Sequence, residues 1–225
     1  MSDIGLKFGE SITPGDPGAN KHSFFMPSLN YPLLAEFDHG GTTWYYSKIF
    51  GMWLSADYTL SNVSTAQKAF NGSTNGAITL PANSAYEFEA RYMITNTGTT
   101  SHTWAVLFAG TATYQYLDFE VRGRSGATSP ATLAADSSNF QNNGSGASSA
   151  LPTTALVATA ASTSATEQVL LDIKGVLRVG NTGGTFIPQI QLSAATGTAA
   201  TMKRGSGIKM TPIGSDTAVT LGNWS

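Results

Sequence analysis

The chain has 225 residues, only 12% of them charged, and a formal net charge of −2. Typical soluble domains carry roughly 25% charged residues, so the polarity here comes from Ser, Thr, Asn, Gln and 24 glycines. Without a basic excess there is no field to attract phosphate backbones, and we expect no nucleic-acid partner. The absence of cysteine excludes disulfides and thiolate chemistry.

Hydropathy indicates neither a membrane span nor a secretory signal. The longest apolar run, 104–110, is far shorter than the ~20 residues that cross a bilayer. Residues 1–7 lack the apolar core of a signal peptide. We therefore expect no membrane partner and synthesis in a cytoplasm.

Residues 1–40 are predicted to form an irregular arm. A dense turn cluster at 14–18 and two further prolines, Pro27 and Pro32, interrupt any regular element. The arm is nevertheless too apolar for a disordered tail. Its large apolar residues are Phe24, Phe25, Met26, Leu29, Tyr31, Leu33, Leu34 and Phe37. We expect this arm to lie against its own domain or against a neighbour.

The next segment, 43–54, has aromatic and β-branched residues on both alternating faces, and Trp53 shares a face with Tyr45 and Ile49. This pattern predicts one strand that is buried on both sides. Residues 56–76 then form a polar connection, with a short helical turn expected at 65–70.

A half-buried antiparallel strand is predicted most clearly at 85–95, where apolar and charged residues alternate. Phe88 and Tyr92 face inward there, whereas Glu87 and Glu89 face outward. Strands at 103–109 and 114–121 follow. The first, WAVLFA, is apolar on both faces, so a two-layer sandwich would leave one face that a neighbouring copy could cover.

The stretch 125–168 is rich in Ser, Ala and Thr and is predicted to form long loops with one or two weak strands. A strand at 169–179 follows, in which Gly175 indicates a bulge or a close approach. A turn at 181–184 leads into a strand at 186–192, where Pro188 indicates an edge or a bulge. A last pair at 207–213 and 218–224 closes the chain. Short strands without a helical period predict an all-β antiparallel β-sandwich or jelly roll.

Three segments carry a family resemblance: ITLPANSAYEFEARYMITNTGTT, IKGVLRVGNTGGTFIPQIQLSAATGTAATMKRGSGIKMTPIG and the terminal GNWS. They resemble the carboxy-terminal modules of tailed-bacteriophage virion proteins, namely head-decoration proteins, head fibres and tail-fibre tips. The matching positions are Leu80, Ala82, Tyr86, Phe88, Glu89, Gly175, Val179, Gly184, Thr185, Gln189, Gly205, Ser206, Ile208, Met210, Ile213 and Gly214.

The resemblance covers about residues 75–225 and implies a trimeric jelly roll of the tumour-necrosis-factor-like kind. We therefore expect two parts: an arm and attachment segment at 1–75, and a jelly-roll trimerisation domain at 76–225. The segment before residue 75 matches no such pattern, which leaves the location within the virion open.

Catalytic arrangements are sparse. Glu87 with Glu89, and Asp118 with Glu120, stand two residues apart on a strand, roughly 7 Å apart. That separation suits an inverting glycosidase, but alternating acids more often mark a solvent-facing strand. His22, His39 and His102 have no metal-ligand spacing, and only Asp38 beside His39 hints at a triad. We predict no catalytic, metal or cofactor site.

Exposed aromatics could stack on sugar rings, although alternation places most of them in the core. The candidates are Trp44, Tyr45, Tyr46, Trp53, Trp104, Tyr114, Tyr116 and Trp224. We expect such a glycan site, if present, in the Asn- and Ser-rich loops around 136–148.

The resulting prediction is a homotrimeric structural protein of a virion, made in the bacterial host cytoplasm, that decorates the phage head by binding the major capsid protein or other virion subunits. The alternative is a tail-fibre or receptor-binding tip that contacts host glycans, and a polysaccharide-degrading enzyme is a third reading. The expected capsid contacts are Phe24, Phe25, Met26, Leu29, Tyr31 and Phe37, and the expected trimer contacts are Trp104, Val106, Phe108, Gln189 and Gln191.

Overall fold

A computed structural model describes the backbone of residues 22–25, 36–39, 42–45, 49–71, 76–126, 134–151 and 154–215. Side chains are described over 49–71, 76–126, 150–151 and 154–214. The chain forms two compact units, Met1–Lys48 and Ile49–Ser225. The boundary therefore lies between Lys48 and Ile49 rather than after residue 75.

The first unit contains a three-stranded antiparallel sheet of β1 (His22–Phe25), β2 (Glu36–His39) and β3 (Thr42–Tyr45). Phe24 stands opposite Phe37, and Phe37 opposite Trp44. Part of the segment predicted as an irregular arm is thus regular sheet. The predicted attachment residues Met26, Leu29 and Tyr31 lie outside the described residues.

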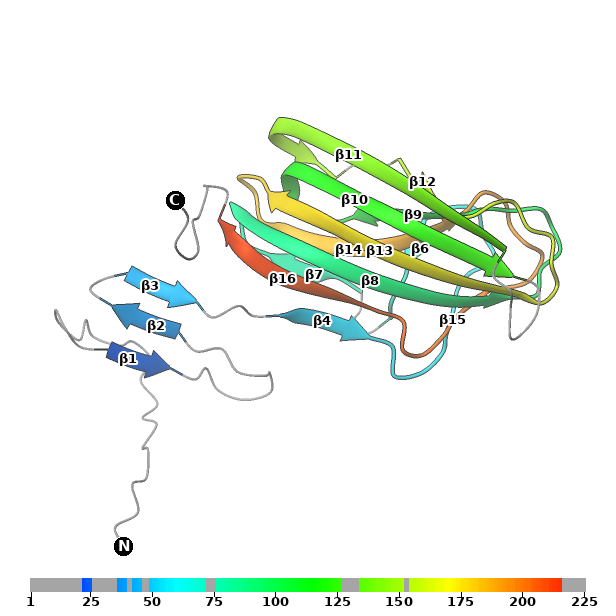
Figure 1. Cartoon of the computed structure of the whole chain (residues 1–225), viewed down its shortest axis with the longest axis horizontal. Coiled ribbons are helices and arrows are strands. Elements are labelled where there is room, and N and C mark those ends of the chain that lie inside the picture. The colour runs from blue at the N-terminus through cyan, green and yellow to red at the C-terminus, as the bar shows by residue number, and fades with distance from the viewer. Residues whose placement is uncertain are drawn as a thin grey trace, which may run out of the picture. The chain divides into compact units, whose positions relative to one another are not determined.

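The second unit is an all-β sandwich (Figure 1), which confirms the predicted fold class. Its larger sheet consists of β4 (Phe50–Trp53), β5 (Tyr58–Thr59), β8 (Ser84–Asn96), β10 (Thr113–Gly126), β11 (Ala134–Ala150), β13 (Glu167–Val179), β15 (Thr201–Met202) and β16 (Gly207–Ser215). The smaller sheet consists of β6 (Gln67–Lys68), β7 (Ile78–Leu80), β9 (Trp104–Ala109), β12 (Leu156–Val157) and β14 (Gly184–Leu192).

Long strands in the larger sheet run in the order β11-β10-β13-β8-β16-β4, and every described pairing is antiparallel. The chain passes between the sheets repeatedly, because β8, β10 and β13 belong to the larger sheet and β9 and β14 to the smaller one. Side chains from both inner faces form one core. Over the described residues the structure contains strands and turns but no helix.

An aromatic cluster joins the two sheets at the centre of this core. Phe88 of the larger sheet makes an edge contact with Phe108 of the smaller sheet, with ring centroids 5.2 Å apart. Phe108 stacks on Phe186 at 4.6 Å and meets Phe119 edge-on at 5.0 Å. The inward and outward faces predicted for 85–95 are confirmed, since Phe88 and Tyr92 are buried while Glu87 and Glu89 are exposed.

Gly175 occupies an inward position of β13 directly against this cluster. A Cβ there would lie 2.7 Å from the Phe119 Cβ and would also overlap the Phe88 ring. Contacts this short are not compatible with any larger residue in an unchanged core. The predicted close approach at Gly175 is therefore confirmed.

Pro188 lies where β14 has only short neighbours on one side. The Pro188 carbonyl accepts a hydrogen bond from the Ala69 backbone N–H, while β7 and β6 pair only with the flanking residues of β14. In an antiparallel strand the N–H and C=O of one residue point to the same side. The nitrogen that cannot donate thus faces the gap between β7 and β6. The predicted edge position is not observed, because β14 lies between β9 and these two short strands.

Three other predicted elements differ from the structure. Segment 43–54 forms two strands in separate units, β3 and β4, rather than one. Residues 65–70 form strand β6 and a buried Ala69–Phe70 pair instead of a helical turn. Segment 125–168 contains the 17-residue strand β11, where long loops with one or two weak strands were expected. The last predicted strand, 218–224, lies outside the described residues.

Candidate binding face

The outward face of the larger sheet carries an ordered set of charged side chains. One row in register crosses five strands from β4 to β10 and consists of Trp53, Gly207, Arg91, Asp172 and Arg122. The adjacent row consists of Gly51, Lys209, Glu89, Lys174 and Glu120. Opposite charges thus alternate from strand to strand, and such cross-strand pairs stabilise a sheet.

A shallow hollow of about 680 Å³ lies over these rows. Besides Trp53 and small or apolar residues, it is lined by Glu89, Arg91, Glu120, Arg122, Arg124, Asp172, Lys174 and Lys209. Five of the chain's 12 basic residues and three of its 14 acidic residues meet here, so the hollow has a formal charge of +2 in a chain of −2. We refer to this surface as the Trp53 face.

Ion pairs hold several of these side chains in place. Arg91 Nε donates to Asp172 Oδ1 at 2.7 Å, and Lys174 Nζ lies 3.7 Å from Glu89 Oε1. Glu89 also lies 3.9 Å from Lys209, through its other oxygen. Exposed pairs of this kind each contribute little to stability. Their main effect is to arrange donors and acceptors on an otherwise weakly charged protein.

Trp53 lies on the surface of the sheet and is 58% exposed. A Cβ built on either Gly51 or Gly207 would overlap its indole ring. Gly51 precedes Trp53 by two residues on β4, and Gly207 is its partner on β16. The ring therefore lies flat over two positions that have no side chain. The prediction that this strand is buried on both sides is wrong, because its outward face, which carries Gly51 and Trp53, is exposed.

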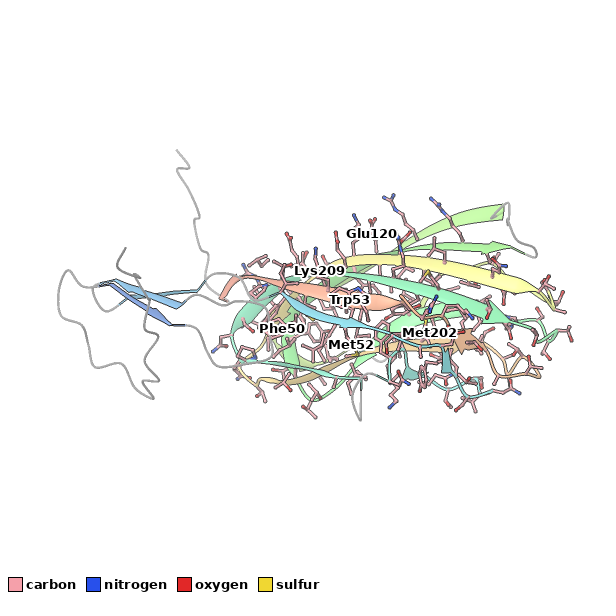
Figure 2. All side chains as sticks on the ribbon, turned by 90° about the horizontal axis from the view of Figure 1, so that it is seen from below. Phe50, Met52, Trp53, Glu120, Met202 and Lys209 are labelled. Carbon is pink, nitrogen blue, oxygen red and sulfur yellow. The ribbon has the colours of Figure 1, made fainter. Side chains whose placement is uncertain are left out.

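Figure 2 shows the two faces of β4, one outward and one toward the core. Trp53, Lys209 and Glu120 lie on the outward side of the larger sheet, while Phe50 and Met52 of the same strand pack against the core.

Asp57 holds the turn at 203–205, which borders the Trp53 face. Its carboxylate accepts hydrogen bonds from Lys203 Nζ and, at 2.9 Å, from the Arg204 backbone N–H. These bonds, led by the one from Lys203, lower the pKa of the Asp57 carboxyl. The turn so fixed carries Gly205, which lines the hollow, and leads into Gly207 beneath the indole.

The two predicted carboxylate pairs lie on the same outward face, in a second shallow hollow beside the first. Strand β13 separates them, placing Lys174 between Glu89 and Glu120, and Val176 between Glu87 and Asp118. Tyr116 is hydrogen-bonded to Asp118, and this bond raises the pKa of the Tyr116 hydroxyl. Glu87 and Glu89 are exposed, whereas a general acid needs a dry pocket to keep its proton near neutral pH.

His102 belongs to a buried network at the end of β8. Its Nδ1 donates to the Thr100 carbonyl at 2.7 Å, and its Nε2 lies 2.8 Å from Glu167 Oε2. The same oxygen accepts from Trp104 Nε1 at 3.2 Å and from Asn96 Nδ2 at 3.3 Å. The His102 and Glu167 side chains are at most 1% exposed. Three buried side chains thus converge on one carboxylate oxygen of Glu167.

Metal ligation finds no support in the described part of the chain, where no three His, Cys, Asp or Glu side chains converge. Within the same residues, no helix is long and apolar enough to span a membrane. The backbones of His22 and His39 stand opposite each other in β1 and β2, and their side chains lie outside the described set, as does that of Asp38.

Three of the five predicted trimer contacts, Trp104, Val106 and Phe108, are buried inside the sandwich. Ala105 and Leu107 on the other face of β9 are buried too, so this strand needs no neighbouring copy to cover it. Only Gln189 and Gln191 are partly exposed, and Gln191 Nε2 donates to the Ser64 carbonyl at 3.0 Å. Among the attachment residues, Phe24, Phe25 and Phe37 lie on β1 and β2.

Trp53 was one of the candidate sugar-stacking aromatics, but the face around it was not predicted as a site. The expected glycan loops at 136–148 fall within β11 instead. A signal was present in the sequence, since the glycine two residues before Trp53 leaves space beside a large aromatic. The partner glycine, Gly207, is distant in sequence and becomes relevant only once the β4–β16 register is known.

Fold and surface thus define an all-β sandwich protein whose larger sheet has an open, charged outward face. No protein-family model matches the chain, and no curated protein sequence matches it either. Six chains among the solved structures match. One is from a structure of infectious bursal disease virus strain Gx, with 8% identity and a TM-score of 0.22 over 83% of this chain and 43% of that one.

Another is from the crystal structure of the infectious bursal disease virus VP2 subviral particle. It shows 10% identity and a TM-score of 0.22, over 83% of this chain and 46% of that one. The present chain thus spans less than half the length of either protein.

Proposed function

We propose that this protein is a structural subunit of a bacteriophage virion and acts by binding rather than by catalysis. The observation that carries this proposal is the form of the Trp53 face. Strands β4, β16, β8, β13 and β10 build it as a shallow, open surface of alternating charges. An enzyme would instead need its catalytic groups in an enclosed site.

The resemblance to head-decoration, head-fibre and tail-fibre modules supports the same function, because it extends over the strands that form the sandwich. Head decoration is the preferred role. In this role the first unit, Met1–Lys48, attaches to the major capsid protein or another virion subunit, with Phe24, Phe25, Met26, Leu29, Tyr31 and Phe37 as the proposed contacts. The division into two compact units favours such a separation of attachment from display.

A homotrimer remains part of the proposal. Its support is the resemblance to trimeric jelly rolls, together with the partly exposed Gln189 and Gln191 on β14. Closed threefold symmetry would use one surface of each copy without leaving an open end.

Receptor binding at the tip of a tail fibre is the second candidate. The flat, exposed indole of Trp53 favours it, because aromatic platforms on β-sandwiches suit the binding of ring-shaped ligands.

Deletion of residues 1–48 tests the proposed division of roles. We expect the remaining chain to be a soluble, β-rich trimer that no longer cosediments with virions lacking their own copy, whereas the full chain does. Light scattering gives the oligomeric state of both proteins, and circular dichroism checks their folding.

Two results would contradict this expectation. Full virion binding by the truncated chain would place attachment in the sandwich. A full chain that stays monomeric at micromolar concentration would refute the trimer.

A further inference from the structure

The indole of Trp53 is held as a platform on the outward face of the larger sheet. One side of the ring covers Gly51 and Gly207, and the other side faces solvent, which accounts for its 58% exposure. Leaving so much aromatic surface in water forgoes part of the burial free energy that a core position would provide. An exposed aromatic ring fixed in one orientation is suited to stacking against the flat face of another ring.

Guanidinium groups lie along the row that begins at Trp53. Arg91 follows after Gly207, and Arg122 follows after Asp172. Both arginine side chains are about 60% exposed, and Arg124 lines the same hollow. Arginine forms paired hydrogen bonds with carboxylates, which makes this row suitable for a ligand that carries such groups.

The dimensions of the row define the size of the ligand. Four strand spacings separate β4 from β10, which corresponds to about 19 Å. This length accommodates an extended chain of several sugar rings, with one ring on Trp53 and its acidic groups toward Arg91 and Arg122.

We infer that the Trp53 face binds an acidic oligosaccharide, with one pyranose ring stacked on Trp53 and a carboxylate bound by Arg91. This inference rests on the proposed binding function and specifies its ligand class. It applies whether the subunit lies on the head or on the tail.

Charge disfavours a second copy of the chain as the occupant of this face. A twofold contact places the same patch of both copies together, and each patch has a formal charge of +2. An acidic glycan is complementary to the positive charge that Arg91, Arg122 and Arg124 concentrate in this hollow.

The test uses the full-length protein on a glycan array that contains oligouronates, sialylated glycans and their uncharged counterparts. Calorimetric titration then measures affinity for the best acidic binder. Replacing Trp53 with alanine should weaken affinity about tenfold or more, equivalent to at least 1.4 kcal/mol. Gly51→Ala should weaken it as well, because the new Cβ displaces the ring while the tryptophan remains.

Two charge variants test the role of Arg91. Arg91→Gln should weaken binding and reduce its dependence on salt. Asp172→Asn should strengthen binding, because it releases the Arg91 guanidinium from its 2.7 Å partner. A purely structural role of this pair would not produce opposite effects. Val157→Ala serves as the matched control, since Val157 is also an exposed apolar residue but lies on the smaller sheet.

Binding that is unchanged in Trp53→Ala would overturn the inference, as would retention of only uncharged glycans. Absence of binding to every acidic glycan at millimolar concentration would also overturn it, as would self-association that Trp53→Ala abolishes. Virion cosedimentation of the same variants separates this inference from the proposed function. Normal cosedimentation without glycan binding refutes only the ligand, whereas glycan binding without cosedimentation refutes only the virion role.

Discussion

Glu167→Ala is expected to lower the free energy of unfolding by about 3–5 kcal/mol, because it leaves His102, Asn96 and Trp104 without their common acceptor. All of these groups are buried. A buried polar group that loses its partner bears the full cost of its desolvation. Urea denaturation of the wild-type and variant proteins measures the difference.

A double variant provides the control. Replacing His102 with phenylalanine and Glu167 with leucine removes both members of the pair, and apolar replacement of a buried ion pair is often neutral or stabilising. We therefore expect the double variant to be more stable than Glu167→Ala. A loss below about 1 kcal/mol in Glu167→Ala would mean that the carboxylate reaches water in the folded protein.

Phe88→Ala should destabilise the sandwich by about 3–5 kcal/mol, as expected for a large buried aromatic residue. Phe88 is 1% exposed and contacts Phe108 and Phe186, so its removal leaves a cavity between the two sheets. Thermal and chemical denaturation both measure this loss.

The neighbouring residue supplies the matched control. Glu87 is exposed on the opposite face of β8, and Glu87→Gln should change stability by less than about 0.5 kcal/mol. A larger loss from Glu87→Gln than from Phe88→Ala would mean that the inward and outward faces of β8 are exchanged.

Local sequence patterns were sufficient to predict the core residues of a strand that has one solvent-exposed face and one buried face. The alternation in β8 identified its core residues correctly, because period-two patterning reports directly which side meets solvent. The local backbone constraints at Gly175 and Pro188 could be predicted for a similar reason. A missing side chain or a missing N–H restricts the backbone wherever it occurs.

Sequence patterns failed to predict structure where neighbouring strands determine whether a segment forms a strand or which of its faces is buried. Strand β11 is rich in Ser, Asn and Gly, which disfavours a strand, yet it pairs with β10 along nearly its whole length. Trp53 and Ile49 were assigned to a buried face because the segment is apolar. That face belongs to the outward side of the larger sheet and is exposed, as it is on the interior strand β8.

The candidate site and the buried network depend on contacts between distant residues. His102 and Glu167 are 65 positions apart, and Trp53 meets Gly207 only through the pairing of β4 with β16. A single sequence contains no local signal for such cross-strand registers. Glu87, Glu89, Asp118 and Glu120 were recognised as pairs within their strands, but Lys174 between them was not.

The amount of this protein in purified virions tests the central claim most directly. Quantitative mass spectrometry of intact particles gives its copy number relative to the major head subunit. Head decoration predicts a copy number of the same order as that subunit, and a tail-fibre tip predicts only a few copies per particle. Complete absence of the protein from purified virions would contradict a structural role in the virion.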